Sequence, residues 1–310
     1  MELDGRPRSG AEGRTLSADV VREVWVRTRV VVGGFLVVVL VAVIGIVLGM
    51  RQVGERLRLP LASRACTVQA DGKVTLDAHQ MANAATIAAI GIQHELPDRA
   101  VVVALATAYQ ESGLRNLAGG DRDSVGLFQQ RPSQGWGSPE EIRDPRYAAD
   151  RFYAALKKVR GWQDMRVTDA AQKVQRSAFP EAYEKWADES EVLTRALLGH
   201  ATGAVVCTFG DDPAMRGEAA ATALTQGLNL DWGLTGSATT AHLTGLTVTA
   251  ANQLDGWRYA HWLVAHANDH GVKRVRFGDL EWTNRGGSWS RVGDGSREHA
   301  EVVAEVFADA

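Results

Sequence analysis

The longest apolar run of the chain covers residues 30–50, where valine, leucine, isoleucine, glycine and alanine dominate and no residue is charged. At a helical rise of about 1.5 Å per residue, this run is long enough to cross the hydrocarbon core of a bilayer. Arg29 and Arg51 flank it. We expect an uncleaved single-pass membrane helix over 30–50. A cleaved signal peptide and a buried core helix are the alternatives.

After this run, from Leu76 to about Gly199, apolar residues recur at helical spacing. Asp77 and Gly91 are suited to begin and end a first helix, and Pro97 starts a second that carries Glu111 near its C-terminal end. Three further helices are expected, with starts at Asp144-Pro145, Thr168 and Pro180. Between the second and third, the glycine-rich segment 116–131 predicts a turn and a hairpin.

The periodicity changes again from about Leu224. Alternating apolar and polar residues predict strands at 243–250 and 272–277, with short strands at 281–282 and 288–289. An amphipathic helix is expected over 256–270 and a final helix over 299–308.

These patterns predict an α+β protein with a single transmembrane helix, then a mainly α domain with a small β-hairpin, then a small α/β C-terminal domain. The expected boundaries are a cytoplasmic tail over 1–29, the membrane helix over 30–50, a juxtamembrane connector over 51–75, the mainly α domain over 76–207, a linker over 208–225 and an accessory domain over 226–310.

Composition narrows the classes of function. The chain has 310 residues, 45% of them hydrophobic and 23% charged, which excludes global disorder. Its net charge of −3 provides no overall basic field, so we expect no nucleic-acid partner. One span also argues against a solute transporter, because polar pathways need several helices or a barrel.

The chain has two cysteines, Cys66 and Cys207, at the two edges of the mainly α domain. A disulfide there would contribute about 4–5 kcal/mol in the chain-entropy model, and two separate buried thiols are the alternative. Arginines are equally frequent on both sides of the 30–50 run, so they do not set its orientation. The cysteine pair favours an extracellular C-terminal portion and a cytoplasmic N-terminus.

Glu111 is the strongest candidate for chemistry. It ends an apolar helix in which Val102, Leu105 and Ala108 can form an apolar wall. Such a wall favours the protonated form of a carboxylic acid, and cleavage of a glycosidic bond requires a proton donor at the leaving oxygen. The alternative is a solvated surface glutamate.

Three runs give the chain a resemblance to a known family: Glu111-Ser112, Gly126-Leu127-Phe128-Gln129, and a later helical run over 170–177. Together they resemble the lysozyme-like fold of soluble lytic transglycosylases and goose-type lysozymes, over about Leu76 to Leu198. The longer runs at 120–136 and 175–183 look still closer to lysozyme-like domains of actinobacterial cell-wall proteins and phage lysins.

The resemblance implies that Glu111 is the general acid. The residues it implies for substrate contact are Ser112, Asp123, Gln129, Gln130, Trp136, Tyr147, Gln172 and Gln175. Ser112 would orient the acid, and the two aromatic residues would stack on sugars unless they pack in the core. Gln172 and Gln175 stand where the family has a tyrosine and an asparagine, which is a departure from its pattern.

A second carboxylate would decide the type of reaction. Asp121 resembles the acidic turn position of goose-type lysozymes and is the candidate base of an inverting hydrolase. If Asp121 and Asp123 only stabilise the turn, Glu111 acts alone. The substrate's own acetamido group would then assist, and an anhydro sugar would form. We favour this transglycosylase reaction over hydrolysis.

The C-terminal histidines do not predict a metal centre. His266 and His270 have a spacing that can bind zinc, but Ala267 stands where the zincin pattern has glutamate. The run over 256–267 resembles the small C-terminal domains of actinobacterial wall hydrolases, for which a binding or packing role is expected. No metal and no cofactor is predicted.

The sequence thus predicts a membrane-anchored peptidoglycan lytic transglycosylase or lysozyme that cleaves the MurNAc–GlcNAc bond with Glu111 as general acid. The alternative is a non-catalytic cell-wall-binding or scaffold module of a membrane complex. The expected partners are peptidoglycan glycan strands and, through one helix, membrane lipid. No protein partner is predicted.

Overall fold

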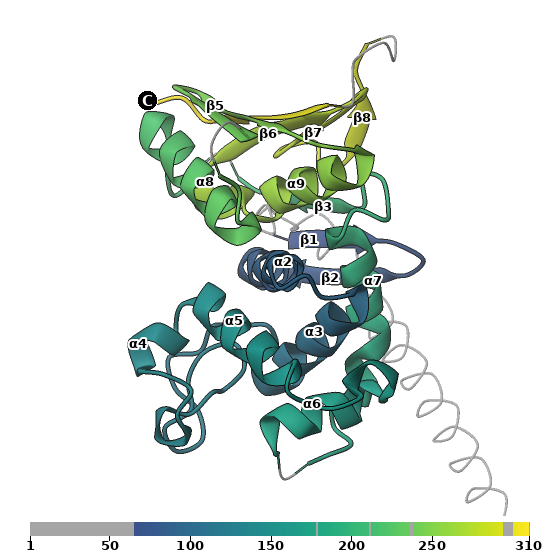
Figure 1. Ribbon diagram of the computed structural model, residues 1–310. Helices are drawn as coiled ribbons and strands as arrows, with labels where there is room; N and C mark the ends of the chain where they lie inside the picture. Colours follow the sequence, from purple (N-terminus) through teal and green to yellow (C-terminus); the bar gives the residue numbers. More distant parts are fainter. Residues whose placement is uncertain (1–64, 178, 211, 236–237, 294–299, 310) are drawn as a thin grey trace, which may run out of the picture. The chain divides into compact units, whose positions relative to one another are not determined.

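The computed structural model describes residues 65–177, 179–210, 212–235, 238–293 and 300–309. Helices built from the first half of this portion contact helices built from the second half, which in turn lie against a sheet (Figure 1). We call residues 65–209 the helical part and residues 212–309 the sheet part.

A three-stranded antiparallel sheet joins the two ends of the helical part. Its strand order is β2-β1-β3, with β1 at Ala65–Gln69, β2 at Lys73–Asp77 and β3 at Val205–Thr208. Alternate residues of each strand are buried, as expected for a sheet with one face on a core. The first and last strands of this part are therefore direct neighbours, although most of the helical part lies between them in sequence.

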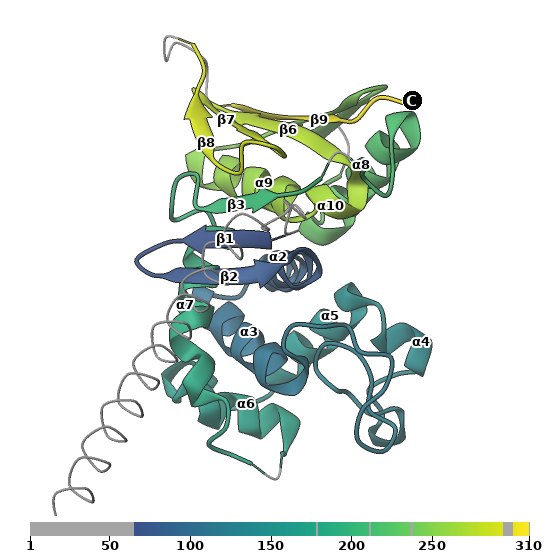
Figure 2. The ribbon, with the colours of Figure 1, turned by 180° about the vertical axis from the view of Figure 1, so that it is seen from behind.

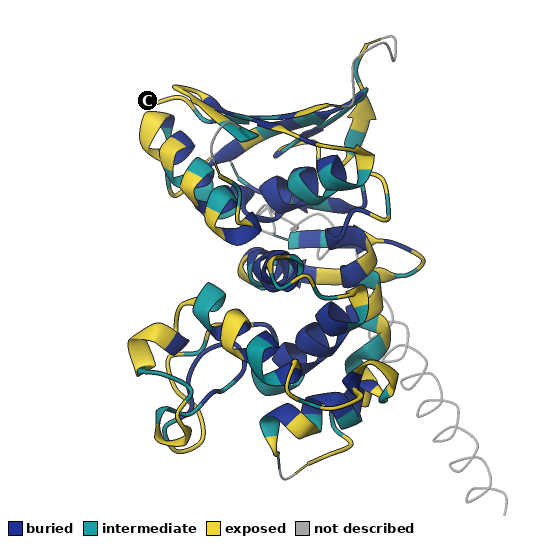
Figure 3. Ribbon diagram, in the orientation of Figure 1, coloured by how far each residue is buried: buried dark blue, intermediate teal, exposed yellow. Residues whose placement is uncertain are grey.

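The α-helices of the helical part are α2 (Ala78–Gln93), α3 (Asp98–Ser112), α4 (Pro139–Ile142), α5 (Pro145–Leu156), α6 (Val167–Gln175) and α7 (Ala187–Leu197). Helix α3 is central and contacts α2, α5, α6 and α7. Its residues from Ala100 to Tyr109 are all buried, which Figure 3 shows as dark blue. A helix that is apolar on every face requires such an environment.

Local chemistry sets the helix starts. Asp77 caps α2 through the Gln80 backbone N–H, and the Gln80 side chain accepts from the Asp77 N–H in return. Pro145 occupies the first turn of α5 after the Asp144 cap. Helix α2 approaches α5 closely at Gly91, where a Cβ would lie 2.9 Å from the Tyr153 hydroxyl.

A six-stranded antiparallel sheet with the order β4-β5-β9-β6-β7-β8 forms the sheet part. Its elements are α8 (Gly217–Trp232), β4 (Thr239–His242), β5 (Gly245–Thr249), α9 (Gln253–Ala265), α10 (Ala267–His270), β6 (Val272–Phe277), β7 (Leu280–Thr283), β8 (Trp289–Arg291) and β9 (Glu301–Val306). Helices α8 and α9 lie on the side of this sheet that faces the helical part (Figures 1 and 2).

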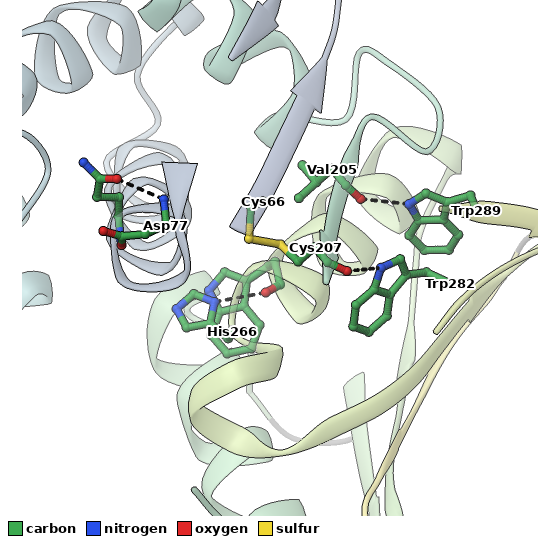
Figure 4. Close-up of a disulfide and its surroundings, with 9 residues drawn as sticks. Cys66, Asp77, Val205, Cys207, His266, Trp282 and Trp289 are labelled. Carbon is green, nitrogen blue, oxygen red and sulfur yellow. Dashed lines mark hydrogen bonds between the residues drawn. A yellow bond between two sulfur atoms is a disulfide. The ribbon is translucent and has the colours of Figure 1, made fainter. Parts of the chain in front are cut away.

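Strand β3 connects the two parts. Cys207 of β3 faces Cys66 of β1 as a register partner, and the two form a disulfide with a Cα–Cα distance of 4.0 Å. On the opposite edge of β3, the indole of Trp282 donates to the Cys207 carbonyl at 3.1 Å, and the indole of Trp289 donates to the Val205 carbonyl at 2.9 Å (Figure 4). The disulfide predicted from the sequence is confirmed.

A buried carboxylate forms a second contact between the parts. Asp231, at the end of α8, is completely buried and forms an ion pair with Arg146 of α5. Its Oδ2 also accepts from the Thr86 hydroxyl at 2.7 Å and from the Trp262 indole at 2.8 Å. Burial raises the pKa of Asp231, and the Arg146 guanidinium acts in the opposite direction. The donors come from both parts, so this carboxylate depends on their association.

A third contact is the imidazole of His261, which is completely buried on α9. Its Nε2 accepts from the Ala204 backbone N–H at 2.9 Å, and its Nδ1 lies 2.7 Å from the Ala196 carbonyl oxygen. Both bonds are satisfied by one neutral tautomer, with the hydrogen on Nδ1. Burial lowers the pKa of His261 to about 4.

The fold class expected from the sequence is wrong and is replaced by a mixed α/β arrangement with two sheets. Among the described residues no helix is long and apolar enough to span a membrane. The expected membrane helix over 30–50 and the tail over 1–29 lie outside the described residues, as does most of the connector. The end of that connector forms β1 and part of β2, and α8 begins inside the expected linker.

Three expected elements also differ. No α-helix begins at Pro180, because the 3-10 helix η3 (Glu184–Trp186) comes first and α7 starts only at Ala187. The segment 116–131 has turns and one isolated bridge, between Val125 and Gln130, in place of a hairpin. The final segment is strand β9, not a helix, and pairs with β5 and β6. Val302, Ala304 and Val306 alternate toward the core, and pairing on both edges outweighs the helix propensity of the alanines and glutamates.

We expect reduction of the disulfide, or the paired change Cys66→Ala and Cys207→Ala, to lower the free energy of unfolding by about 4–5 kcal/mol, because the closed loop is long. Urea unfolding of the full chain with and without reductant measures this effect. The double variant is the control for reductant, which should not shift its midpoint further. An unchanged midpoint in the reduced wild type would contradict the prediction.

Acid should destabilise the fold through His261. Its pKa is lower in the folded chain than in the unfolded chain, so the unfolded state takes up the proton first as the pH falls. The contribution of His261 to the free energy of unfolding is fully present above about pH 6.5. It is lost toward pH 4, at about 1.4 kcal/mol per pH unit. Urea midpoints across this range should show a shallower slope for His261→Gln, with His242→Gln, a change on exposed β4, as the matched control. Equal slopes for all three proteins would refute the assignment.

Candidate active site

Glu111 lies in the last turn of α3 and is half-buried. The helix ends just after it, because Gly113 adopts a left-handed conformation with φ 62°. The expected wall residues Val102, Leu105 and Ala108 are buried in the same helix. Glu111 Oε1 accepts a hydrogen bond from the hydroxyl of Tyr183 at 2.7 Å.

Tyr183 is the site residue to which the sequence analysis gave no role. Its side chain is completely buried, and it precedes the short 3-10 helix η3 (Glu184–Trp186) in a segment expected to be an α-helix. Burial, and next the proximity of Glu111, raise the pKa of Tyr183, so its hydroxyl remains a donor. Trp186 stacks on Tyr109 of α3 with ring centroids 4.8 Å apart, which holds this segment against the helix that carries Glu111.

Two polar side chains fix the segment 126–128 beside the end of α3. The Ser112 hydroxyl donates to the Leu127 carbonyl at 2.7 Å and lies 3.0 Å from the Ala108 carbonyl oxygen. The Gln175 amide, at the end of α6, donates to the Phe128 carbonyl at 2.7 Å. Both residues were expected to contact substrate, and in the structure both bind the backbone of this segment.

The other predicted glutamines also bind the protein itself. Gln129 donates to the Gly126 carbonyl at 3.1 Å, and Gln172 donates to the Ser177 carbonyl at 2.8 Å. Gln130 is buried and donates to the Ala148 carbonyl at 3.0 Å. These three amides therefore bond to backbone carbonyls and hold loops of the protein in place.

Gly126 is required where this segment meets α4. Its φ of 79° is a left-handed conformation, and a Cβ there would lie 2.6 Å from the Ile142 carbonyl oxygen. Any other residue would push the segment away from α4. The glycine of the predicted motif therefore has a packing reason in this chain.

The two aspartates of the turn have different environments. Asp123 accepts from the Arg131 guanidinium at 2.8 Å and from the Ser133 backbone N–H at 2.8 Å. These bonds, the one from Arg131 first, hold the pKa of Asp123 well below its usual range. Asp121 has a side chain that is 93% exposed and lies 3.8 Å from its neighbour Arg122. Asp123 thus serves the turn, and Asp121 faces solvent.

The two aromatic residues predicted to stack on sugars, Trp136 and Tyr147, lie close together, and Tyr147 contacts the backbone beside Trp136. The Tyr147 hydroxyl donates to the Trp136 carbonyl at 3.1 Å, and the Tyr147 ring lies against Gly137. Trp136 is half-buried against the core. Phe179, which the sequence analysis did not single out, is 73% exposed near Tyr183 in sequence and is a further candidate for sugar contact.

No protein-family model and no curated protein sequence matches this chain.

A groove of about 950 Å³ lies between the loop 134–136, the end of α5 and the end of α6. Trp136 and Gln175 are among its lining residues, and Glu111 is not. The groove and the glutamate are linked through the segment 126–128, because Gln175 holds Phe128 and Ser112 holds Leu127. The structure thus brings three of the predicted residues, Ser112, Gln129 and Gln175, onto this segment and leaves Asp121 in solvent.

Proposed function

We propose that this protein cleaves the glycan strands of peptidoglycan as a lytic transglycosylase, with Glu111 as general acid. The observation that carries the proposal is the bond between the Tyr183 hydroxyl and Glu111 Oε1 at the end of a buried helix. Glycosidic cleavage needs a carboxyl group in a fixed orientation, and this contact holds the Glu111 carboxyl in one. The resemblance of the Glu111-Ser112 and 126–129 runs to lytic transglycosylases supports the same reading.

The geometry supports a division of roles between the two carboxyl oxygens. Oε1 is occupied by the Tyr183 hydroxyl, which leaves Oε2 to carry the proton toward the leaving oxygen of the MurNAc–GlcNAc bond. As that bond breaks, the acetamido oxygen of MurNAc attacks its anomeric carbon. The 6-hydroxyl then displaces it, forms the anhydro ring and returns a proton to Glu111. No water is consumed.

The environments of the two turn aspartates favour this route over hydrolysis. An inverting hydrolase needs a second carboxylate that holds a water opposite the acid. Asp123 is bound to Arg131 and Ser133 within its turn, and the Asp121 side chain is almost fully solvated. Hydrolysis with Asp121 as base is the competing reaction. The disulfide supports a location in an oxidising compartment, which includes the exterior where peptidoglycan lies.

A non-catalytic wall-binding module is the second candidate, and one observation favours it. The groove beside α5 and α6 does not include Glu111 among its lining residues. A protein that only holds a glycan strand needs such a groove and no acid.

Replacing Glu111 by Gln should abolish lysis of peptidoglycan in a zymogram, with a loss of at least about a hundredfold, because the amide cannot donate the proton. Tyr183→Phe should reduce the rate by about tenfold, since it removes one bond that orients the acid. Glu140→Gln, an exposed change on α4, is the matched control. Full lysis by Glu111→Gln would refute the role of this residue, and thermal unfolding shows whether each variant is folded.

The products should carry anhydro ends. Mass spectrometry of peptidoglycan digested by the full chain should find fragments one water lighter than their reducing counterparts, because the ring closes within the sugar. Reducing ends that incorporate labelled oxygen from water would instead establish hydrolysis. The variant Asp121→Asn separates the two, since only hydrolysis depends on that carboxylate.

A further inference from the structure

The groove beside α5 and α6 carries a concentration of positive charge. Its charged lining residues, which we call the groove cations, are Arg151, Lys158, Arg160, Lys173 and Arg176. No aspartate or glutamate is among the described residues that line it. The whole chain has a net charge of −3, so this positive field is local and opposes the overall charge.

The groove cations are available to a ligand. All of them are exposed, and within the described portion of the chain none lies in an ion pair with a carboxylate. Asp169, one turn before Lys173 on α6, bonds to Arg166 at 2.9 Å; this bond first, and the nearby charge of Lys173 to a smaller extent, lower the pKa of Asp169. Arg176 is held in a left-handed conformation with φ 54° at the end of α6, where glycine or asparagine is less strained.

Helix dipoles account for only part of this charge. Lys158 and Arg160 follow the end of α5, and Lys173 and Arg176 stand at the end of α6, where one cation would offset the carbonyl groups of each helix. Arg151 lies inside α5 and gains nothing from the dipole. Helix dipoles therefore do not explain why five cations line the same groove.

The rest of the lining suits a sugar chain. Trp136 offers an aromatic face, Gln134 offers an amide, and Val159 and Met165 add apolar surface. Such a mixture of rings, amides and spread cations fits a polymer of sugars that bears negative groups at intervals.

We propose that this groove binds the free carboxylates of the peptide stems that hang from a glycan strand. This proposal rests on the proposed function, and it adds that the protein selects stem-bearing, non-amidated strands. Carboxylates are favoured over phosphates because of how the positive charge is distributed. The single charges of stem carboxylates match cations that are spread along the groove.

Binding is best measured with the full chain carrying Glu111→Gln, so that cleavage does not remove the ligand. The probe is purified peptidoglycan that has been freed of phosphate polymers with hydrofluoric acid. A second sample of the same material has its carboxyl groups converted to amides. We expect the amidated sample to bind about tenfold more weakly, and binding to the unmodified sample to fall as salt rises from about 0.05 M to about 0.5 M.

The variant Lys158→Glu with Lys173→Glu should lose about tenfold in binding to unmodified peptidoglycan and should be indifferent to amidation, because both changes remove the same contacts. The matched control is Lys73→Glu with Lys157→Glu, which makes the same change of charge at exposed lysines outside the lining. The control should bind as the parent does.

Equal binding of the two samples would overturn the proposal, as would equal loss in the control. Binding only to material that retains its phosphate polymers would assign the groove to phosphate and also overturn it. The two proposals fail separately. If lysis requires Glu111 but is unaffected by the groove variant and by amidation, the proposed reaction is supported and carboxylate binding in the groove is refuted. If no lysis occurs but binding depends on stem carboxylates, the groove proposal is supported and the proposed enzyme activity is refuted.

Discussion

Strand β3 is the constraint on which the arrangement depends, because each of its edges is used by a different part of the protein. One edge pairs with β1, and the disulfide locks the register at Cys66 and Cys207. The other edge would be an unpaired row of carbonyl groups, a feature that folded proteins avoid. Here two tryptophan indoles from the sheet part bind those carbonyls. The closure of the helical part and the attachment of the sheet part thus both depend on β3.

This closure explains how one glutamate at a helix end acquires a fixed place. Helix α3 is buried along most of its length and is held by four other helices. The Tyr183 segment reaches Glu111 only after the chain has passed through α4, α5 and α6, and Trp186 then stacks against α3. A short contact between residues so distant in sequence requires that the intervening helices pack in one way.

The starts of α2, α3 and α5 could be predicted from the sequence because local chemistry determines them. The Asp77 cap and Pro97 predicted α2 and α3, and the two cysteines predicted the disulfide. The features that the sequence analysis missed depend on contacts between residues far apart in the sequence. Strand β9 has the composition of a helix and becomes a strand between two partners. Tyr183 could not be matched to Glu111, since no spacing in the sequence signals a contact across 72 positions.

The glutamines show why a polar residue in a motif is weaker evidence of substrate contact than an unpaired charge is. Polar residues near a catalytic motif suggest sugar contacts, yet an amide also satisfies loop carbonyls, and Gln129, Gln130 and Gln175 are used in that way. The groove cations form no ion pair within the described portion of the chain, and helix dipoles account for only some of them. The two features are also separated in space: a tyrosine hydroxyl, not a cation, contacts Glu111, and no aspartate or glutamate is among the described residues that line the groove.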